Sequence, residues 1–159
     1  SLMNPLNGSL VHTATGVLQT NGALSLSFPP SAIGNSYYLK INHRNSVETW
    51  SANPVLINAV TTYDFSNSAG KAYENNQVEV EPNVFALYSG DIIDANTNTS
   101  GVQDAVIESS DYSEMENAVY NVESGYITTD LTGDGVVESA DYSIMENNVY
   151  LVISVKKPF

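Results

Sequence analysis

The chain has 159 residues, 42% of them apolar, and a formal net charge of −13. This length allows one or two domains, and the apolar content is sufficient for ordinary cores, so a globular chain is expected. The absence of cysteine excludes disulfides, zinc–thiolate sites and thiol catalysis. No apolar run approaches the roughly 18 residues of a membrane span, and the N-terminal sequence lacks a signal-peptide pattern, so membrane insertion is not expected.

The negative charge is concentrated in the second half of the sequence. Residues 1–86 carry three basic and five acidic side chains, whereas residues 87–159 carry two basic and thirteen acidic ones, a net charge of −11. Such a charge argues against nucleic acid as a partner, because phosphates need Lys and Arg to neutralise them. Acidic residues at fixed spacing favour cation binding over a merely solvated surface.

Residues 10–88 contain short segments that alternate between apolar and polar residues, separated by turns rich in Asn, Gly, Ser and Pro. This pattern is typical of β-strands, and a spacing of about ten residues between short strands suggests an antiparallel sandwich, immunoglobulin-like or prealbumin-like, over residues 1–88. Ser1 and Leu2 are left out of this prediction, and residues 66–76 are expected to form an exposed loop. The predicted strands are residues 23–28, 37–43, 47–51, 55–57, 61–65 and 84–88.

The sequence of residues 89–159 contains an internal repeat with a period of thirty residues. Residues 111–120 and 141–150 are identical at eight of ten positions, which indicates a duplication. Each copy predicts a helix with one apolar stripe, and two such short helices are expected to pack against each other. Asp111 and Asp141 stand where the helices start and are expected to act as N-caps, and Gly125 is expected to end the first helix. The two stripes are Tyr112, Met115, Val119 and Val122, and Tyr142, Met145, Val149 and Val152.

Residues 130–141 have the spacing of a tight loop around a hard cation such as Ca²⁺. Glycine at the sixth place allows the sharp turn of such a loop. Carboxylates crowded this closely repel one another unless a cation lies among them. The oxygen-bearing side chains at places one, three, five, nine and twelve are Asp130, Thr132, Asp134, Glu138 and Asp141.

The first copy of this loop is irregular and allows two alignments. Counting back twelve places from Asp111 starts the loop at Ser100 and puts Ala105 where the turn glycine is expected. Starting instead at Asp91 requires about nine extra residues before Asp104, but it preserves both ends of the loop. We prefer the second alignment, in which Asp91, Asp104, Glu108 and Asp111 are ligands. The extra residues offer further oxygens, and a degenerate copy kept only for helix pairing is the alternative.

The paired loop–helix repeats over residues 89 to about 158 resemble a dockerin domain, which is a pair of EF-hand-like calcium loops, each followed by one helix. The twelfth-place Asp141 resembles the dockerin loop more than an ordinary EF-hand, which has Glu there. The resemblance implies two Ca²⁺ sites, with the main-chain carbonyls of Val136 and Val106 as additional ligands. The preceding segment, residues 37–65, resembles a β-module found before such repeats near the C-termini of secreted bacterial surface proteins. The resemblance therefore implies a secreted or cell-surface location.

The resemblance implies binding rather than catalysis. In dockerins the tenth and eleventh loop places influence the choice of partner, commonly a cohesin, and here these places are Ser109, Ser110, Ser139 and Ala140. We favour packing of the helices on the neighbouring β-module over an external cohesin-like partner. A carbohydrate-binding β-module is the alternative function, with Trp50 as a sugar-stacking residue, although core packing is the commoner role for such an aromatic. No catalytic constellation stands out, so no enzyme activity is expected.

Overall fold

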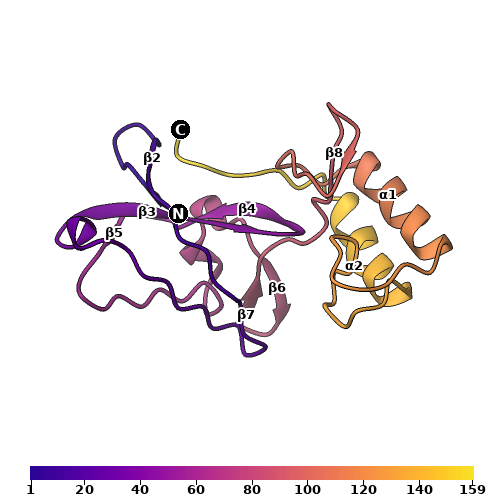
Figure 1. The fold of residues 1–159 in the computed structure, drawn as a ribbon, viewed down its shortest axis with the longest axis horizontal. Coiled ribbons are helices and arrows are strands. Elements are labelled where there is room, and N and C mark those ends of the chain that lie inside the picture. Colours follow the sequence, from indigo (N-terminus) through magenta and orange to yellow (C-terminus); the bar gives the residue numbers. More distant parts are fainter.

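The computed structural model describes residues 1–159 and has a mixed architecture, with antiparallel β-sheets followed by two C-terminal helices that pack together (Figure 1). The main sheet has five strands in the order β2-β1-β3-β4, and β5 also pairs with β3. All its pairings are antiparallel. Its strands are β1 (Leu2–Met3), β2 (Leu10–His12), β3 (Ser36–His43), β4 (Ser46–Trp50) and β5 (Val55–Leu56).

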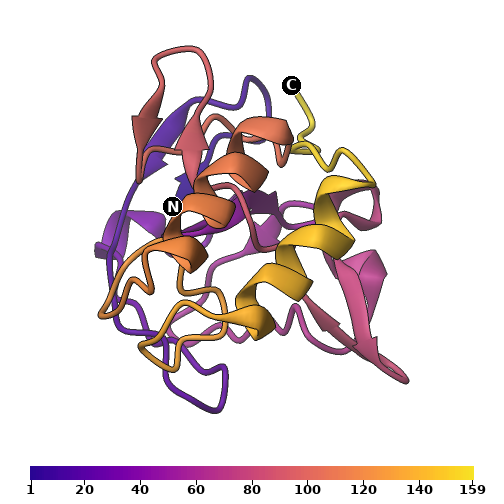
Figure 2. The ribbon, with the colours of Figure 1, turned by 90° about the vertical axis from the view of Figure 1, so that its right-hand side faces the viewer.

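Two separate hairpins complete the β structure. One joins β6 (Val78–Glu81) to β7 (Val84–Ala86), and the other joins β8 (Ile93–Asp94) to β9 (Thr99–Ser100). The helices are α1 (Ser109–Tyr120) and α2 (Ser139–Val149), which lie side by side in Figure 2. Neither has the length and apolarity that crossing a membrane would need.

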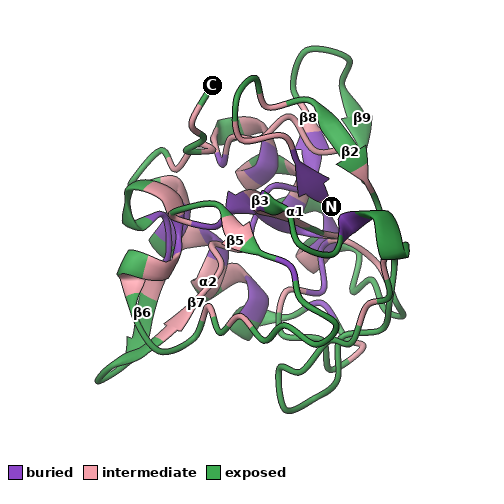
Figure 3. Cartoon of the chain, turned by 90° about the vertical axis from the view of Figure 1, so that its left-hand side faces the viewer, coloured by how far each residue is buried: buried purple, intermediate pink, exposed green.

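Four predicted strands are confirmed, in whole or in part, and two are wrong. The segments at 37–43, 47–51, 55–57 and 84–88 correspond to β3, β4, β5 and β7. Residues 23–28 and 61–65 form no strand, because alternation alone does not supply a partner strand for the backbone hydrogen bonds. Much of the surface of the β half is loop, as the exposed segments in Figure 3 show.

Leu2, which the sequence analysis left out together with Ser1, belongs to the sheet. Leu2 is fully buried and lies in β1 between β2 and β3. It packs in a small core with Ala32, Tyr37 and Ile57. A two-residue strand has too little pattern to be recognised in a sequence, so only its burial reveals it.

The helices share a second core, which also includes a residue of the sheet. Its buried members are Val47, Ile92, Ile107, Met115, Ala118, Val137 and Met145. Val47 lies in β4, so the first residues of that strand pack with the helices rather than with the core of the sheet. The predicted division between residues 88 and 89 is therefore crossed by direct apolar contacts.

The predicted helices are confirmed, but their ends and their stripes differ from the expectation. Val122 and Val152 lie beyond the helix ends and are largely exposed, whereas Ala118 and Asn148 are buried in the helix faces. The first helix ends at Tyr120, well before Gly125. Both helices stop earlier because the segment after each of them turns through a valine in the left-handed conformation, with φ 51° at Val122 and 48° at Val152.

Candidate metal centre

Two buried aspartates organise the second loop. Asp130 is 2% exposed, and its Oδ1 and Oδ2 accept hydrogen bonds from Gly133 N at 2.8 Å and Gly135 N at 3.1 Å. Asp141 is fully buried and accepts bonds from Thr132 N at 2.8 Å and Glu138 N at 3.0 Å. The first and twelfth places thus hold the loop in a closed turn from both ends.

The first loop repeats three of the four hydrogen bonds of the second, with Asp91 in the place of Asp130. The fourth differs, because Asp91 Oδ1 accepts a bond from Asp104 N at 3.1 Å, and Asp111 Oδ1 accepts an additional bond from Ile92 N at 2.8 Å. Ala105 N donates to Asp91 Oδ2 at 3.0 Å, as Gly135 N does to Asp130. Asp111 accepts bonds from Ile93 N at 3.1 Å and Glu108 N at 2.9 Å, as Asp141 does from Thr132 and Glu138. The geometry therefore agrees with the alignment that starts at Asp91 rather than at Ser100, which is exposed and bonds to Glu114.

The extra residues of the first loop form the β8–β9 hairpin. Asp94 accepts bonds from Asn96 N at 2.8 Å and Thr97 N at 3.3 Å within this hairpin. Asp104 accepts a bond from Ala95 N at 3.1 Å at the base of the hairpin. The insertion is thus a folded excursion that leaves both ends of the loop in the arrangement of the second copy.

The two loops are linked through the segments that follow the helices. Ile107 N donates to Ile153 O at 2.7 Å, and Val155 N donates to Ala105 O at 2.9 Å. The second loop repeats this pairing thirty residues away, where Val137 N donates to Glu123 O at 2.9 Å and Gly125 N to Gly135 O at 2.9 Å. Each loop therefore pairs with the segment after the other repeat's helix, which interlocks the two copies.

The aspartates are buried with little compensating charge. The ion pair of Arg44 with Asp130, at 3.5 Å, is the only one that any of the four buried aspartates makes. Burial is the main cause that raises the pKa of Asp91 to about 7, and the negative charges of Asp111 and Asp104 add to it. The hydrogen bonds from Asp104 N and Ala105 N act in the opposite direction and lower this pKa. Burial also raises the pKa of Asp111. A buried carboxylate resists ionisation unless a positive charge lies nearby.

The remaining predicted ligands lie nearer the surface. Asp134 is exposed and accepts a bond from Val136 N at 2.9 Å, whereas Asp104 is half-buried and accepts one from Val106 N at 3.2 Å. Glu138 and Glu108 are the N-caps of α2 and α1, so Asp141 and Asp111 occupy the third helical position instead of the expected cap. Thr132 donates its hydroxyl to Asp130 Oδ1 at 3.4 Å.

The donor chemistry of both loops fits a hard cation. Every predicted ligand is an oxygen, which suits Ca²⁺. A carboxylate oxygen that accepts one N–H bond has a further lone pair for a metal. In this arrangement no group of three or more His, Cys, Asp or Glu side chains converges closely enough to hold a metal ion. Complete ligation would therefore require the exposed Asp134 and Glu138 side chains to turn inward.

The predicted partner-binding positions lie in the first turns of the helices. Ser109, Ser139 and Ala140 are exposed, whereas the Ser110 hydroxyl is buried and has no hydrogen-bond partner. Tyr112 and Tyr142 contact each other between the helices, with ring centroids 5.4 Å apart. The duplicated faces therefore meet at a tyrosine pair.

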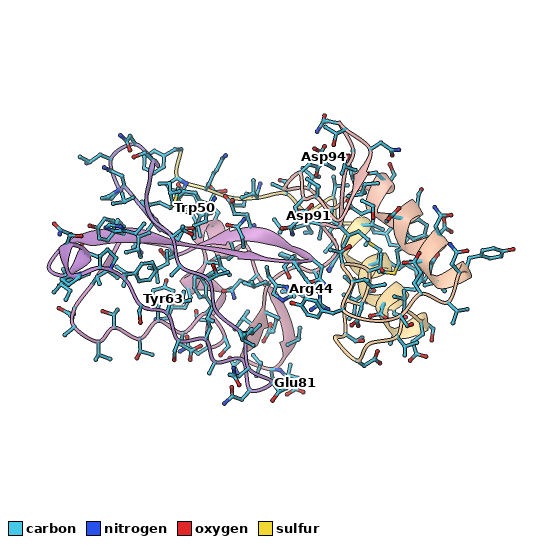
Figure 4. The ribbon with its side chains drawn as sticks, viewed as in Figure 1. Arg44, Trp50, Tyr63, Glu81, Asp91 and Asp94 are labelled. Carbon is cyan, nitrogen blue, oxygen red and sulfur yellow. The ribbon has the colours of Figure 1, made fainter.

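The sequence analysis missed the contribution of the β half to the second loop. Arg44, in the turn between β3 and β4, donates from Nε to Ile127 O at 3.1 Å and from a terminal nitrogen to Asp130 O at 2.7 Å. Its guanidinium also lies 4.2 Å from the ring centroid of Tyr126. Figure 4 shows Arg44 at the junction of the two halves. Its position between two predicted strands is the only signal in the sequence.

Trp50 has the packing role rather than the sugar-stacking role. Its side chain is 4% exposed, and Nε1 donates to Glu48 Oε1 at 2.6 Å. The edge of its ring meets Tyr38, with centroids 6.2 Å apart. A sugar cannot stack on a ring that is covered in this way.

Comparisons of the chain with protein-family models, with curated proteins and with solved structures found no match.

Proposed function

We propose that this chain is a non-catalytic, calcium-binding module for attachment or architecture, belonging to a secreted or cell-surface bacterial protein. The observation that carries the proposal is the repeated pair of buried aspartates, Asp91 with Asp111 and Asp130 with Asp141. Each pair organises a loop through backbone hydrogen bonds, three of which occur in both loops. Burying four carboxylates is costly unless cations compensate them.

The charge of the second half supports bound cations. Residues 87–159 carry a net charge of −11, and two Ca²⁺ ions would cancel four of these charges. In this proposal the loops are dockerin-like and EF-hand-like, and Asp130 and Asp141 supply charged oxygens to the second ion. Asp91 and Asp111 do the same for the first. The bound ions would supply the positive charge that the buried carboxylates lack.

The helices are proposed to dock within the chain rather than primarily on an external cohesin-like partner. Val47 packs in the helical core, and Asn148 Nδ2 donates to Ser89 O at 2.7 Å. Asn76 Nδ2 donates to Ser154 O at 3.2 Å on the segment that follows α2. These contacts support a β-module buttressed by calcium-held helices. The sandwich arrangement of residues 1–88 stays a prediction.

Calorimetric titration with calcium tests the proposal. The chain is expected to bind two ions, and Asp141→Asn is expected to bind one, because the variant removes a buried charged ligand from the second loop. Asp64→Asn is the matched control, since Asp64 is an exposed carboxylate that bonds only within its own turn. Two unaltered sites in Asp141→Asn, or no binding by the unmodified chain, would contradict the assignment.

A further inference from the structure

The turn between β3 and β4 lies between the starting points of the two loops. Asn45 is 1% exposed, although it stands in a two-residue turn, where side chains are usually solvated. Figure 4 shows Asp91 and Arg44 in the region where the two halves of the molecule meet. The turn is therefore in a position to contact both loops at once.

Asn45 makes one hydrogen bond to each loop entrance. Its main-chain oxygen accepts a bond from Gly90 N at 2.7 Å, and Gly90 directly precedes Asp91. Its Nδ2 donates to the main-chain oxygen of Asp130 at 3.0 Å. One buried residue thus links the backbone just before the first ligand place of the first loop to the backbone at that place in the second loop.

The residues on either side of Asn45 strengthen the link. The Ser46 carbonyl accepts a bond from Gln103 Nε2 at 2.7 Å, and the same Nε2 lies 3.2 Å from Asp91 O. Arg44 also donates to Asp130 O, at 2.7 Å. The main-chain oxygen of Asp130 is therefore bound by Arg44 and Asn45 of the turn, and that of Asp91 by Gln103, which also bonds to Ser46 at the start of β4.

The apolar packing of the hairpin does not account for these bonds. Val47 already anchors β4 in the helical core, and a hairpin held only by Val47 would need no donor directed at Asp130. The polar contacts instead converge on the backbone of the two residues whose carboxylates start the loops. Groups that orient metal ligands in this way tune the affinity of the site, because they fix the ligand before the ion binds.

We propose that Asn45 is a positioning residue that couples the two calcium loops, so that an ion in one loop raises the affinity of the other. The inference rests on the proposed calcium function. An ion in the first loop fixes Asp91 and the preceding Gly90. Gly90 holds Asn45 through its backbone bond, and Asn45 then holds Asp130 in its binding position. Coupling of this kind is reciprocal between the two sites.

Calorimetric calcium titration of Asn45→Ala tests this proposal. The unmodified chain is expected to bind two ions with positive coupling. Asn45→Ala is expected to bind two ions with weaker coupling, because it loses the bond to Asp130 O while Arg44 keeps its own. Its second-loop affinity is expected to fall by about 10-fold to 100-fold, as for other groups that orient metal ligands. The weaker coupling is a readout that simple destabilisation of the sheet would not produce.

Ser51→Ala is the matched control. Ser51 is fully buried in the same hairpin region, accepts a bond from Leu39 N at 2.9 Å and donates to Asn53 O at 2.9 Å, but these partners lie outside the loops. This variant is expected to lose stability and keep both affinities and their coupling. If Asn45→Ala does not fold, Asn45→Asp serves instead, because it keeps the size of the side chain and replaces the donor by an acceptor facing Asp130 O.

The outcomes separate the two proposals. No calcium binding by the unmodified chain overturns both the calcium function and the coupling. If the unmodified chain binds two ions, and the Asn45 variant keeps the same affinities and the same coupling as Ser51→Ala, the role of Asn45 is overturned while the calcium function stands. Weaker coupling in the Asn45 variant, with coupling retained in Ser51→Ala, supports the role of Asn45.

Discussion

At the residue scale, the sixth place of each loop illustrates how the two copies differ. Gly135 has φ +90°, and Ala105 occupies the same place in the first loop with φ +72°. A left-handed backbone suits glycine but brings the Cβ of an L-residue close to the neighbouring carbonyl oxygen, at a cost of roughly 1–2 kcal/mol. The first loop therefore carries strain that the second loop lacks.

Ala105→Gly is expected to stabilise the chain by about 0.5–1 kcal/mol, because relief of the left-handed strain exceeds the extra entropy that glycine gains in the unfolded state. Urea unfolding without calcium measures this change. Gly135→Ala is the reciprocal control and is expected to destabilise by a similar amount, since its new Cβ would meet no atom within 4 Å and only the backbone conformation is affected. A destabilised Ala105→Gly would show that the alanine side chain is needed in this loop.

At the scale of the element, the end of α1 is closed by a valine in a left-handed conformation. Val122 N donates to Val119 O at 3.1 Å and Glu123 N donates to Ala118 O at 3.1 Å, which together form a Schellman motif. The left-handed position of this motif usually contains glycine, and a β-branched residue there is strained. Val122 is also 72% exposed, so its side chain gains little from packing.

Val122→Gly is expected to raise the free energy of unfolding by about 1 kcal/mol, because glycine adopts this conformation without the Cβ conflict. Thermal and urea unfolding in the presence of calcium measure the effect. Val80→Gly is the control, because it makes the same valine-to-glycine replacement at an exposed position of β6 where the backbone is not left-handed. It is expected to destabilise the chain. Equal destabilisation by both substitutions would contradict a strained helix end.

At the scale of the whole molecule, the chain passes from the β half to the helices and returns. The segment after α2 runs back over the β half in Figure 1 and ends near the first strands. Phe159 meets Tyr38 with ring centroids 6.1 Å apart. Together with Val47 and Asn45, this return ties the two halves at several places, so loosening of the loops is expected to reach the β3–β4 turn.

Removal of calcium with a chelator is expected to lower the melting temperature and to speed hydrogen exchange in residues 89–159 and in the turn at Arg44 and Asn45. One ion at 100 times its dissociation constant contributes about 2.7 kcal/mol of stability. Hydrogen exchange with mass spectrometry measures the regional effect. The Asp130→Ala variant is expected to respond less, and a chain whose melting and exchange are the same with calcium and chelator would contradict the calcium-held architecture.

The sequence alone predicted the helices and their packing against each other, because these features depend on local spacing and on the repeat. For the first loop it favoured one of two alignments. Alternation of apolar and polar residues was less reliable for the strands. The segment at 23–28 alternates without forming a strand, whereas Leu2 and Met3 form one in the middle of the sheet with almost no pattern. A strand needs a partner as well as a suitable sequence.

By itself, the sequence determined that acidic oxygens recur at the spacing of a cation loop, since ligand order within twelve residues is a local property. Only the tertiary structure decided that Asp91 corresponds to Asp130, that the intervening residues fold into a hairpin, and that Asn45 joins the two loop entrances. Asn45 and Asp130 are 85 residues apart in the chain. Contacts over such distances arise from packing of the whole molecule, through Val47 and the helical core, and no local pattern encodes them.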